Sequence, residues 1–534
     1  MERMAQEKPA GAALRRLAPT LLALVALAGC TDLAGQFRAA RDAGTARAMY
    51  VAGFENIESV YIEAVAADDL AMAGLGGLSA VDPALAVQRR GSRLALLVNG
   101  QPASAIYTPA DDDATAWGVL TARTVDAARA ASPLLREAPS EAVYEAVFAG
   151  VIGSLDGYSH YSGAESAREN RASREGFGGI GVRIAVEDAG VRIVSVMHYT
   201  PAERAGLRAD DLISDIDDDP AQDLDQQTAV DRLRGPVNSR VRLTVLRGGE
   251  GAPISVAVTR AHVVPESVTY RREGDVGYLR IYSFNLETAD SLRKEIANAR
   301  DEIGGAVRGY VLDLRGNPGG LLDQAVATAD LFLDRGRIVS THGRHPDSHQ
   351  FFDATPGDVT DGLPIVVLIN GNSASAAEIV AAALQDSGRA AVIGSNSYGK
   401  GTVQTVLTMP NDGEMTLTWA RFHAPSGYPL DRLGVLPTIC TNDGADAARM
   451  LAALRAGDIR AVPTTLRNRA NPRDVAALDG LRAACPVRRA EQPADLQLAL
   501  GLLAEPTLYA RAVHLADPPE LAATGEAAPA PAHP

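Results

Sequence analysis

Strand-like and helix-like segments alternate over residues 263–440, and this alternation constrains the fold more than any other feature of the chain. Strands that alternate with helices build βαβ units around a largely parallel sheet. The sequence therefore predicts an α/β core in this region. Its segments, in chain order, are YLRIYSF, ETADSLRKEIANAR, RGYVLDLRG, LLDQAVATADLFL, GLPIVVLIN, ASAAEIVAAALQD and RAAVIG.

A second, smaller module precedes this core. It begins with the glycine-rich string GFGGIGVRI at 176–184 and continues through VRIVSVM, PAERAGLRADDLISDID, a helix near 225–234 and VRLTVLR. The order strand, small helix, strand, helix, strand predicts a compact unit of its own.

The flanking regions are mainly helical. Residues 34–75, 113–131 and 138–155 read as helices, and residues 93–108 read as a hairpin with Asn99-Gly100 as its turn. Residues 443–515 also read as helical, and the Pro/Ala-rich tail from 516 is expected to be disordered.

The N-terminus has the pattern of a secretory signal. Arg15 and Arg16 precede the apolar run 17–28, which is short against the roughly 20 residues of a membrane span. The run ends in Leu-Ala-Gly-Cys30, which resembles the bacterial lipobox, so we expect Cys30 to carry lipid and anchor the chain to a membrane. A plain signal peptide with a chance cysteine is the alternative. Thr31 slightly favours the outer membrane.

Only two other cysteines remain, Cys440 and Cys485. An oxidising compartment would let them form a disulfide. Two unrelated buried thiols are the alternative.

A buried strand, 365–369, runs into the string NGNSASAAE, and a helix follows. Ser375 therefore lies at a helix N-terminus, where backbone N–H groups have no partner within the helix. A serine there can attack a carbonyl while the N–H of Ala376 meets the oxyanion. The alternative is that Ser375 is an ordinary helix cap.

Lys400 follows Ser375 by 25 residues, between two glycines in the string SYGKGTVQ. If the lysine is buried, desolvation disfavours its charged form, and a neutral lysine can serve as a general base. A surface loop lysine is the alternative.

Together these strings resemble the C-terminal processing peptidases, or tail-specific proteases, of peptidase family S41. The strings LDLRGNPGG at 312–320 and HAPSGYPLDRLGVLPTI at 423–439 add to the likeness. The resemblance implies that Ser375 is the nucleophile, Lys400 the base and Gln404 a residue that orients the amine. It also implies an oxyanion hole made by Ala376 and Gly320.

The smaller module resembles a bacterial PDZ domain, most clearly in PAERAGLRADDLI. Its glycine loop would hold a substrate's terminal carboxylate, and the strand 180–185 would pair with the last residues of that substrate. The loop residues so implied are Phe177, Gly178, Gly179, Ile180 and Gly181.

Other chemistries have little support. The net charge of −15 and an aromatic content of 5% argue against nucleic acid as a partner. Ser375 lacks a GxSxG context, and His342, His345 and His349 read as an exposed loop rather than a metal site. No metal or cofactor is expected.

We therefore expect a serine endopeptidase on the periplasmic side of the cell envelope that cuts proteins near free C-termini. An inactive PDZ scaffold, and a hydrolase that serves signalling or an adaptor, are the alternatives. A homo-oligomer and an adaptor-dependent form are both compatible with the sequence. The domains expected are a signal peptide at 1–29, a mainly helical region at 30–140, a first piece of the protease core at 141–171, the PDZ domain at 172–262, the S41 core at 263–442, a helical region at 443–515 and a tail at 516–534.

Overall fold

The computed structural model describes residues 44–515, apart from 249–251, 442, 443, 445, 460, 463, 470 and 472. Cys30, the signal segment and the tail lie outside the described residues. The chain divides into two compact units. The first comprises the residues up to 167 together with 405–417, and the second comprises 168–404 with the residues from 418 onward.

The first unit combines helices with a small antiparallel sheet. The expected hairpin is confirmed, because β2 pairs with β3 around the turn Asn99-Gly100, where both residues have positive φ. A third strand, β1, was not expected, because only the first half of its sequence LAVQRR is apolar. The elements are a helix over 44–60, α2 (Ala67–Gly76), η1 (Gly77–Ala80), β1 (Leu85–Arg90), β2 (Arg93–Val98), β3 (Gln101–Tyr107), α3 (Ala114–Ala131), α4 (Pro133–Glu137), α5 (Ser140–Gly153) and β4 (His160–Ser162).

The boundary between these helices and the protease core differs from the expected one. Residues 141–167 group with the N-terminal unit instead of forming a first piece of the core. The reason is the packing of α5, whose residues Val147, Phe148 and Val151 are fully buried in one cluster with Tyr50. Burial of this apolar face stabilises α5 against the N-terminal helices.

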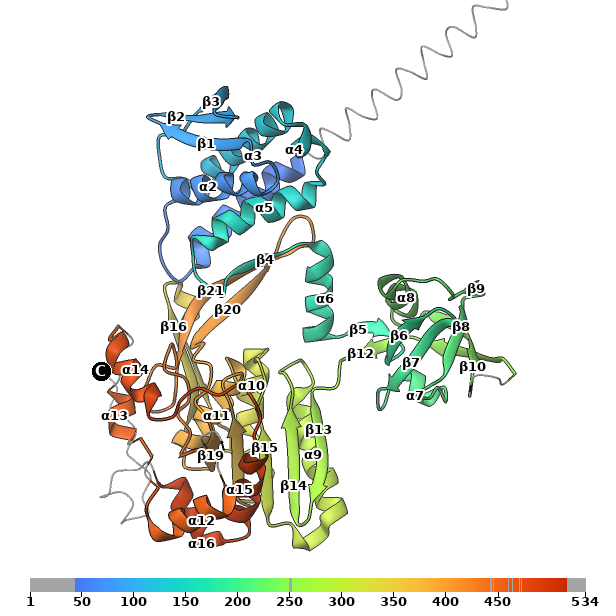
Figure 1. Cartoon of the computed structure of the whole chain (residues 1–534), viewed down its shortest axis with the longest axis vertical. Coiled ribbons are helices and arrows are strands. Elements are labelled where there is room, and N and C mark those ends of the chain that lie inside the picture. Colours follow the sequence, from blue (N-terminus) through green and yellow to red (C-terminus); the bar gives the residue numbers. More distant parts are fainter. Residues whose placement is uncertain are drawn as a thin grey trace, which may run out of the picture. The chain divides into compact units, whose positions relative to one another are not determined.

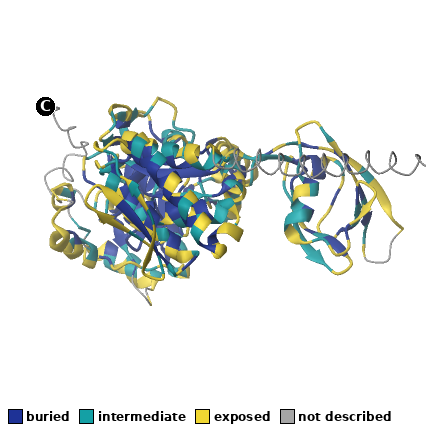
Figure 2. Cartoon of the chain, turned by 90° about the horizontal axis from the view of Figure 1, so that it is seen from above, coloured by how far each residue is buried: buried dark blue, intermediate teal, exposed yellow. Residues whose placement is uncertain are grey.

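The second unit contains a six-stranded sheet with the order β13-β14-β15-β18-β19-β22. All neighbours from β14 onward pair in parallel, and only β13 is antiparallel, so the predicted α/β fold is confirmed. Every residue of β15, β18 and β19 is buried, as expected for parallel strands covered on both faces (Figure 2). The strands are β13 (Val268–Glu273), β14 (Val276–Ile281), β15 (Gly309–Asp313), β18 (Ile365–Ile369), β19 (Ala390–Gly394) and β22 (Ile439–Cys440).

Helices cover both faces of this sheet (Figure 1). One face packs against α9 (Thr288–Ile303), α10 (Leu322–Asp330) and α11 (Ala376–Asp386). The opposite face, which includes Val366 and Leu368, packs against α12 (Ala447–Ala456), α15 (Pro493–Leu503) and α16 (Pro506–Val513). The helical C-terminal region is therefore one layer of the protease core. Short elements complete it: η2 (Gly304–Ala306), η3 (Pro346–Ser348), α13 (Thr464–Asn468) and α14 (Val475–Ala483).

A second sheet of the core has the order β17-β16-β21-β20. Its strands are β16 (Arg337–Gly343), β17 (Gln350–Asp353), β20 (Thr402–Thr408) and β21 (Glu414–His423). The β20–β21 hairpin passes from one unit to the other, because its residues 405–417 belong to the first. There β21 pairs with β4.

The PDZ-like module has its own sheet, ordered β11-β10-β8-β7-β6, and its own apolar core. Strand β6 lies at the edge, and α8 packs beside it. The helix α6 (Ala164–Glu175) precedes the module. The module's elements are β5 (Phe177–Gly179), β6 (Val182–Glu187), β7 (Gly190–Val196), α7 (Pro201–Arg204), β8 (Leu212–Ile216), β9 (Asp219–Pro220), α8 (Gln226–Leu233), β10 (Arg240–Leu246), β11 (Ile254–Thr259) and β12 (Ala261–Val263).

Candidate active site

Ser375 occupies the turn between β18 and α11. Its φ is +56° and its ψ is −117°, a conformation that costs a non-glycine residue about 1–3 kcal/mol. Ala376 is the first residue of α11, so its N–H has no partner within the helix. The turn therefore presents a half-buried serine hydroxyl and a backbone donor side by side.

The residues before Ser375 fix this turn to the loop that follows β15. The Ser373 hydroxyl donates to the carbonyl of Leu314 at 2.8 Å and accepts from the N–H of Asn370 at 2.9 Å. The N–H of Ala374 donates to the carbonyl of Asn317 at 2.9 Å. Asn370 and Ser373 are fully buried, so these bonds are shielded from water.

Lys400 lies in the loop between β19 and β20, and it is half-buried. This loop directly contacts the turn that carries Ser375, because the N–H of Tyr398 donates to the carbonyl of Ser373 at 3.0 Å. Gly401 has a φ of +55°, and a Cβ atom there would lie 2.0 Å from the backbone nitrogen of Asp431. A side chain at 401 would therefore displace the loop that carries the lysine.

Glu378 joins the two loops. It is fully buried on the first turn of α11. Its Oε2 accepts from the N–H of Ser375 at 2.8 Å and from the N–H of Lys400 at 3.1 Å, so both candidate residues are bound to one oxygen atom. Its Oε1 accepts from the Ser397 hydroxyl at 2.5 Å and from the N–H of Gly399 at 2.7 Å.

These four bonds stabilise the charged form of Glu378, but burial has the larger effect and raises the pKa of its carboxyl. The role of Glu378 did not emerge from the sequence. The spacing Ser-x-x-Glu, which is typical of a capping box, was the available signal.

The glycine loop after β15 faces Ser375. A Cβ atom on Gly319 would lie 2.7 Å from the Cβ of Ser375 and 3.1 Å from the nitrogen of Ala376, so only glycine fits there. The N–H of Gly319 donates to Asn317 Oδ1 at 2.8 Å. Gly320, the oxyanion residue suggested by the sequence, pairs with Phe284 in an isolated bridge. Among the described hydrogen bonds, the N–H of Gly320 donates to no protein acceptor.

A buried ionic cluster surrounds Arg315, which directly precedes this glycine loop. Arg315, at the end of β15, binds Asp313 at 2.6 Å and Asp495 of α15 at 3.2 Å. Asp313 also accepts from the Tyr278 hydroxyl at 2.5 Å. Asp495 also pairs with Arg488 at 3.2 Å, so removal of Arg315 would leave the fully buried carboxylate of Asp313 without its ion-pair partner.

Gln404 lies on β20, which begins at Thr402, so Lys400 precedes the strand that carries Gln404. The Gln404 amide donates to Thr402 Oγ1 at 2.9 Å and to Thr418 Oγ1 at 3.2 Å. Its side chain is thus held between β20 and β21.

The PDZ-like module places its glycine string differently from the open loop that the sequence suggested. Residues Phe177–Gly179 form β5 and pair with β12, and the carbonyl of Gly178 accepts from Gly235 at 3.0 Å. Ile180 and Gly181 make the bend into β6. The edge strand itself starts at Val182 rather than at Ile180, and the side-chain amide of Gln226 on α8 reaches the carbonyl of Ile184 at 3.4 Å.

Comparisons with known proteins agree with this architecture. The family model for peptidase family S41 matches residues 275–441, and the PDZ domain model matches residues 178–258. A carboxy-terminal-processing protease of Bartonella bacilliformis is 44% identical over 292 residues, which cover 54% of this chain and 67% of that protein. The chain belongs to peptidase family S41.

Two further likenesses are more distant. A probable CtpA-like serine protease of Staphylococcus aureus strain N315 is 31% identical over 312 residues, which cover 58% of this chain and 62% of that protein. Among solved structures, the photosystem II D1 C-terminal processing protease aligns with 74% of this chain and 93% of its own at 21% identity, with a TM-score of 0.37.

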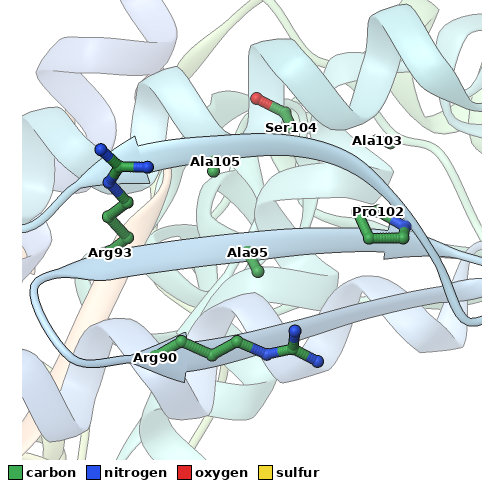
Figure 3. Close-up of a pocket in the computed structure, with 7 residues that line it drawn as sticks. All are labelled: Arg90, Arg93, Ala95, Pro102, Ala103, Ser104 and Ala105. Carbon is green, nitrogen blue, oxygen red and sulfur yellow. The ribbon is translucent and has the colours of Figure 1, made fainter.

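One hollow of the described surface lies away from these loops. A hollow of about 420 Å³ lies on the three-stranded sheet of the first unit, where Arg90 and Arg93 project from neighbouring strands (Figure 3). Its other lining residues are Ala95 and Pro102–Ala105, so it contains no nucleophile apart from the hydroxyl of Ser104. Within the described ranges, no group of three or more His, Cys, Asp or Glu could hold a metal ion, and no helix is long and apolar enough to span a bilayer.

Proposed function

We propose that this protein is a serine endopeptidase that processes other proteins near their C-termini, with Ser375 as nucleophile and Lys400 as general base. The observation that carries the proposal is the pair of hydrogen bonds that Glu378 Oε2 accepts from the backbone N–H groups of both residues. This arrangement holds a strained serine and a loop lysine next to each other at a helix N-terminus.

In the proposed reaction, the neutral amine of Lys400 takes the Ser375 hydroxyl proton while Oγ attacks the scissile carbonyl carbon. A C–O bond forms, and the carbonyl electron pair moves to oxygen, where the N–H groups of Ala376 and Gly320 stabilise it. The amine then gives its proton to the leaving nitrogen, and the C–N bond breaks. Water releases the acyl group by the same route, and Gln404 is proposed to orient the Lys400 side chain.

The PDZ domain is proposed to select the substrate. Its edge strand β6 and the neighbouring helix α8 offer a place where an extended peptide can add as a further strand. The bend at Ile180 and Gly181, directly after β5, is where a terminal carboxylate would meet backbone N–H groups. The names of the S41 relatives, which refer to carboxy-terminal processing, support this choice of substrate.

We further propose that the protein acts on the periplasmic side of the cell envelope, anchored through lipid on Cys30. The lipobox-like string before Cys30 motivates the anchor. The disulfide between Cys440 and Cys485 suits an oxidising compartment. Palmitate labelling that persists unchanged in a Cys30→Ser variant would refute the anchor.

Substitution of Ser375 tests the proposed activity. Ser375→Ala removes the nucleophile with little change in volume, so proteolysis of a peptide with a free apolar C-terminus should vanish while the thermal midpoint stays unchanged. Ser387→Ala, at the opposite end of α11, is the matched control and should keep parent activity. Equal cleavage by Ser375→Ala and the parent would refute the assignment, and peptide binding without any cleavage by the parent would favour the inactive scaffold.

A further inference from the structure

A short segment of the C-terminal region contacts both loops of the candidate active site. Residues 482–489, which we call the clasp, begin at the end of α14, continue toward α15 and contain Cys485. None of the clasp residues belongs to the S41 motifs quoted above. They do, however, contact the two loops that carry Ser375 and Lys400.

The clasp binds the nucleophile loop through its backbone. The carbonyl of Arg488 accepts from the N–H of Gly371 at 2.7 Å, and the carbonyl of Arg489 accepts from the Asn370 side-chain amide at 2.8 Å. A Cβ atom on Gly371 would lie 2.4 Å from a methyl group of Val487, so clasp and loop are in close contact. Asn370 in turn binds Gly316, at the start of the glycine loop, at 3.0 Å.

The same segment binds the lysine loop. The Ser395 hydroxyl donates to the Arg488 carbonyl at 3.0 Å and accepts from the Arg488 N–H at 3.1 Å. The Arg482 guanidinium donates to the carbonyls of Leu433 at 2.7 Å and Ser397 at 3.3 Å. One carbonyl, that of Arg488, therefore receives hydrogen bonds from both catalytic loops.

A single covalent bond anchors the clasp. Cys485 is buried and forms a disulfide with Cys440, at the end of β22 in the central sheet. The segment around it contributes little other packing. Among the described residues of 446–492, the buried ones are Leu454, Arg467, Leu478 and Cys485. The Arg488 guanidinium also binds the buried carboxylate of Asp495 at 3.2 Å. Because the clasp buries little apolar surface, this ion pair and the disulfide are its main anchors on the side away from the two loops.

We propose that the clasp positions the two catalytic loops and that the Cys440–Cys485 disulfide keeps it in place, so that the peptidase works at full rate only when oxidised. The inference rests on the proposed function, because the two loops are catalytic only if Ser375 and Lys400 act as stated. Loss of the disulfide lets residues 482–489 move, and small displacements of Ser375 against Lys400 lower the rate of the chemical step while the PDZ groove is unaffected.

Reduction of the full-length protein with dithiothreitol tests this. The disulfide takes up two electrons and two protons and becomes two thiols, while the dithiol becomes a cyclic disulfide. We expect kcat to fall about ten- to a hundredfold with KM changed by less than about twofold, and to recover on reoxidation. The double variant Cys440→Ser/Cys485→Ser should show the low kcat and no response to reductant. Cys30→Ser, which keeps the disulfide, should respond as the parent does.

Arg482 offers a test that leaves the disulfide intact. Arg482→Ala should lower kcat without changing KM, and Arg482→Lys should restore part of the loss, because an ammonium group can still donate to the carbonyls. The matched control is Arg473→Ala, an exposed arginine just before α14, which should have no effect.

Hydrogen exchange of the Ser375→Ala protein provides a readout that needs no activity. On reduction, amides of 370–376 and 395–401 should exchange faster, while those of β7 in the PDZ domain stay unchanged. Equal exchange in both redox states would overturn the proposed role of the clasp. The same holds if the parent protein has the same kcat before and after reduction. Faster exchange on reduction, together with an oxidised parent protein that cleaves no peptide, would instead contradict the proposed function and leave the clasp supported.

Discussion

Lysine is rare in this chain: only Lys8, Lys294 and Lys400 account for the lysines among its 51 basic residues. Arginine supplies the positive charge almost everywhere else, including the buried pair with Asp313. A lysine at 400 therefore points to a need that arginine cannot meet, namely a group that can lose its proton. The bond of its backbone N–H to Glu378 fixes the start of that side chain beside Ser375.

Lys400→Arg should be nearly as damaging as Lys400→Ala. Arginine keeps the charge but stays protonated, so it cannot accept the Ser375 proton, and kcat should fall at least about a thousandfold in both variants. Lys294→Arg on α9 is the matched control and should retain parent kcat. Substantial activity in Lys400→Arg would mean that residue 400 supplies only charge.

Glu378→Gln tests the link between the two loops. The amide replaces one of two oxygens that accept four hydrogen bonds, so at least one buried donor would face an NH₂ group. We expect a loss of about 1–3 kcal/mol in the free energy of unfolding and at least a tenfold lower kcat. Glu302→Gln, on the exposed end of α9, serves as control in denaturant titrations and peptide cleavage. Parent-like kcat in Glu378→Gln would rule out the positioning role.

At the scale of elements, the sheet β17-β16-β21-β20 carries a cluster of histidines. The His342 ring on β16 lies 5.1 Å from His423 on β21 and 5.3 Å from His349, measured between ring centroids. Burial, followed by the nearby positive groups His349 and Arg337 for His342, and His342 and Arg421 for His423, lowers the pKa of both imidazoles. The Nδ1 atom of His423 is buried and has no hydrogen-bond partner.

This cluster should make stability depend on pH. Since the pKa of His423 is lower in the folded state than its ordinary value of 6.5, the unfolded chain binds more protons below that pH. The stability is therefore present above about pH 6.5 and is lost as the pH falls. In His423→Phe, the thermal midpoint should decline less between pH 7.5 and 5 than in the parent. His514→Phe, an exposed site, should decline as the parent does, and an identical decline in His423→Phe would contradict the argument.

At the scale of the whole molecule, one chain combines a PDZ domain with an S41 peptidase core. The PDZ domain interrupts the chain between α6 and β13, and both of its connections, β5 and β12, pair with each other. The two ends of the module are thus joined into one antiparallel stem. Because β5 and β12 are paired, the points where the chain enters and leaves the PDZ domain lie close together, and this closeness makes domain insertion possible.

Amidation of a substrate's C-terminus should weaken its cleavage if the module captures a carboxylate. Loss of that charge removes charge-assisted hydrogen bonds worth about 1.5–3 kcal/mol, so KM should rise roughly ten- to a hundredfold. Gly179→Trp should act alike, because a Cβ atom there already lies 2.8 Å from the Phe177 ring. Val194→Trp adds the same ring at an exposed position of β7 and should leave KM unchanged. Equal cleavage of free and amidated peptides below saturation would exclude carboxylate capture.

The sequence by itself determined the α/β core, the inserted PDZ module and the strings that contain Ser375 and Lys400. These features are local. A run such as IVVLI before NGNSASAAE specifies a buried strand, a turn and a helix through patterns a few residues long. Backbone conformation and the alternation of buried and exposed side chains are set by neighbouring residues, so the sequence is informative about these local features.

Only the tertiary structure decided what surrounds these residues. It showed Glu378 between the two loops, α5 within the N-terminal unit, Lys400 ahead of its strand, and the clasp against Gly371 and Ser395. Each depends on contacts between distant parts of the chain, and the clasp lies between 85 and 119 residues beyond the loop residues that it binds. Such contacts arise from the packing of the whole core, and a hydrogen bond to a backbone carbonyl leaves no mark on the identity of the residue that provides it.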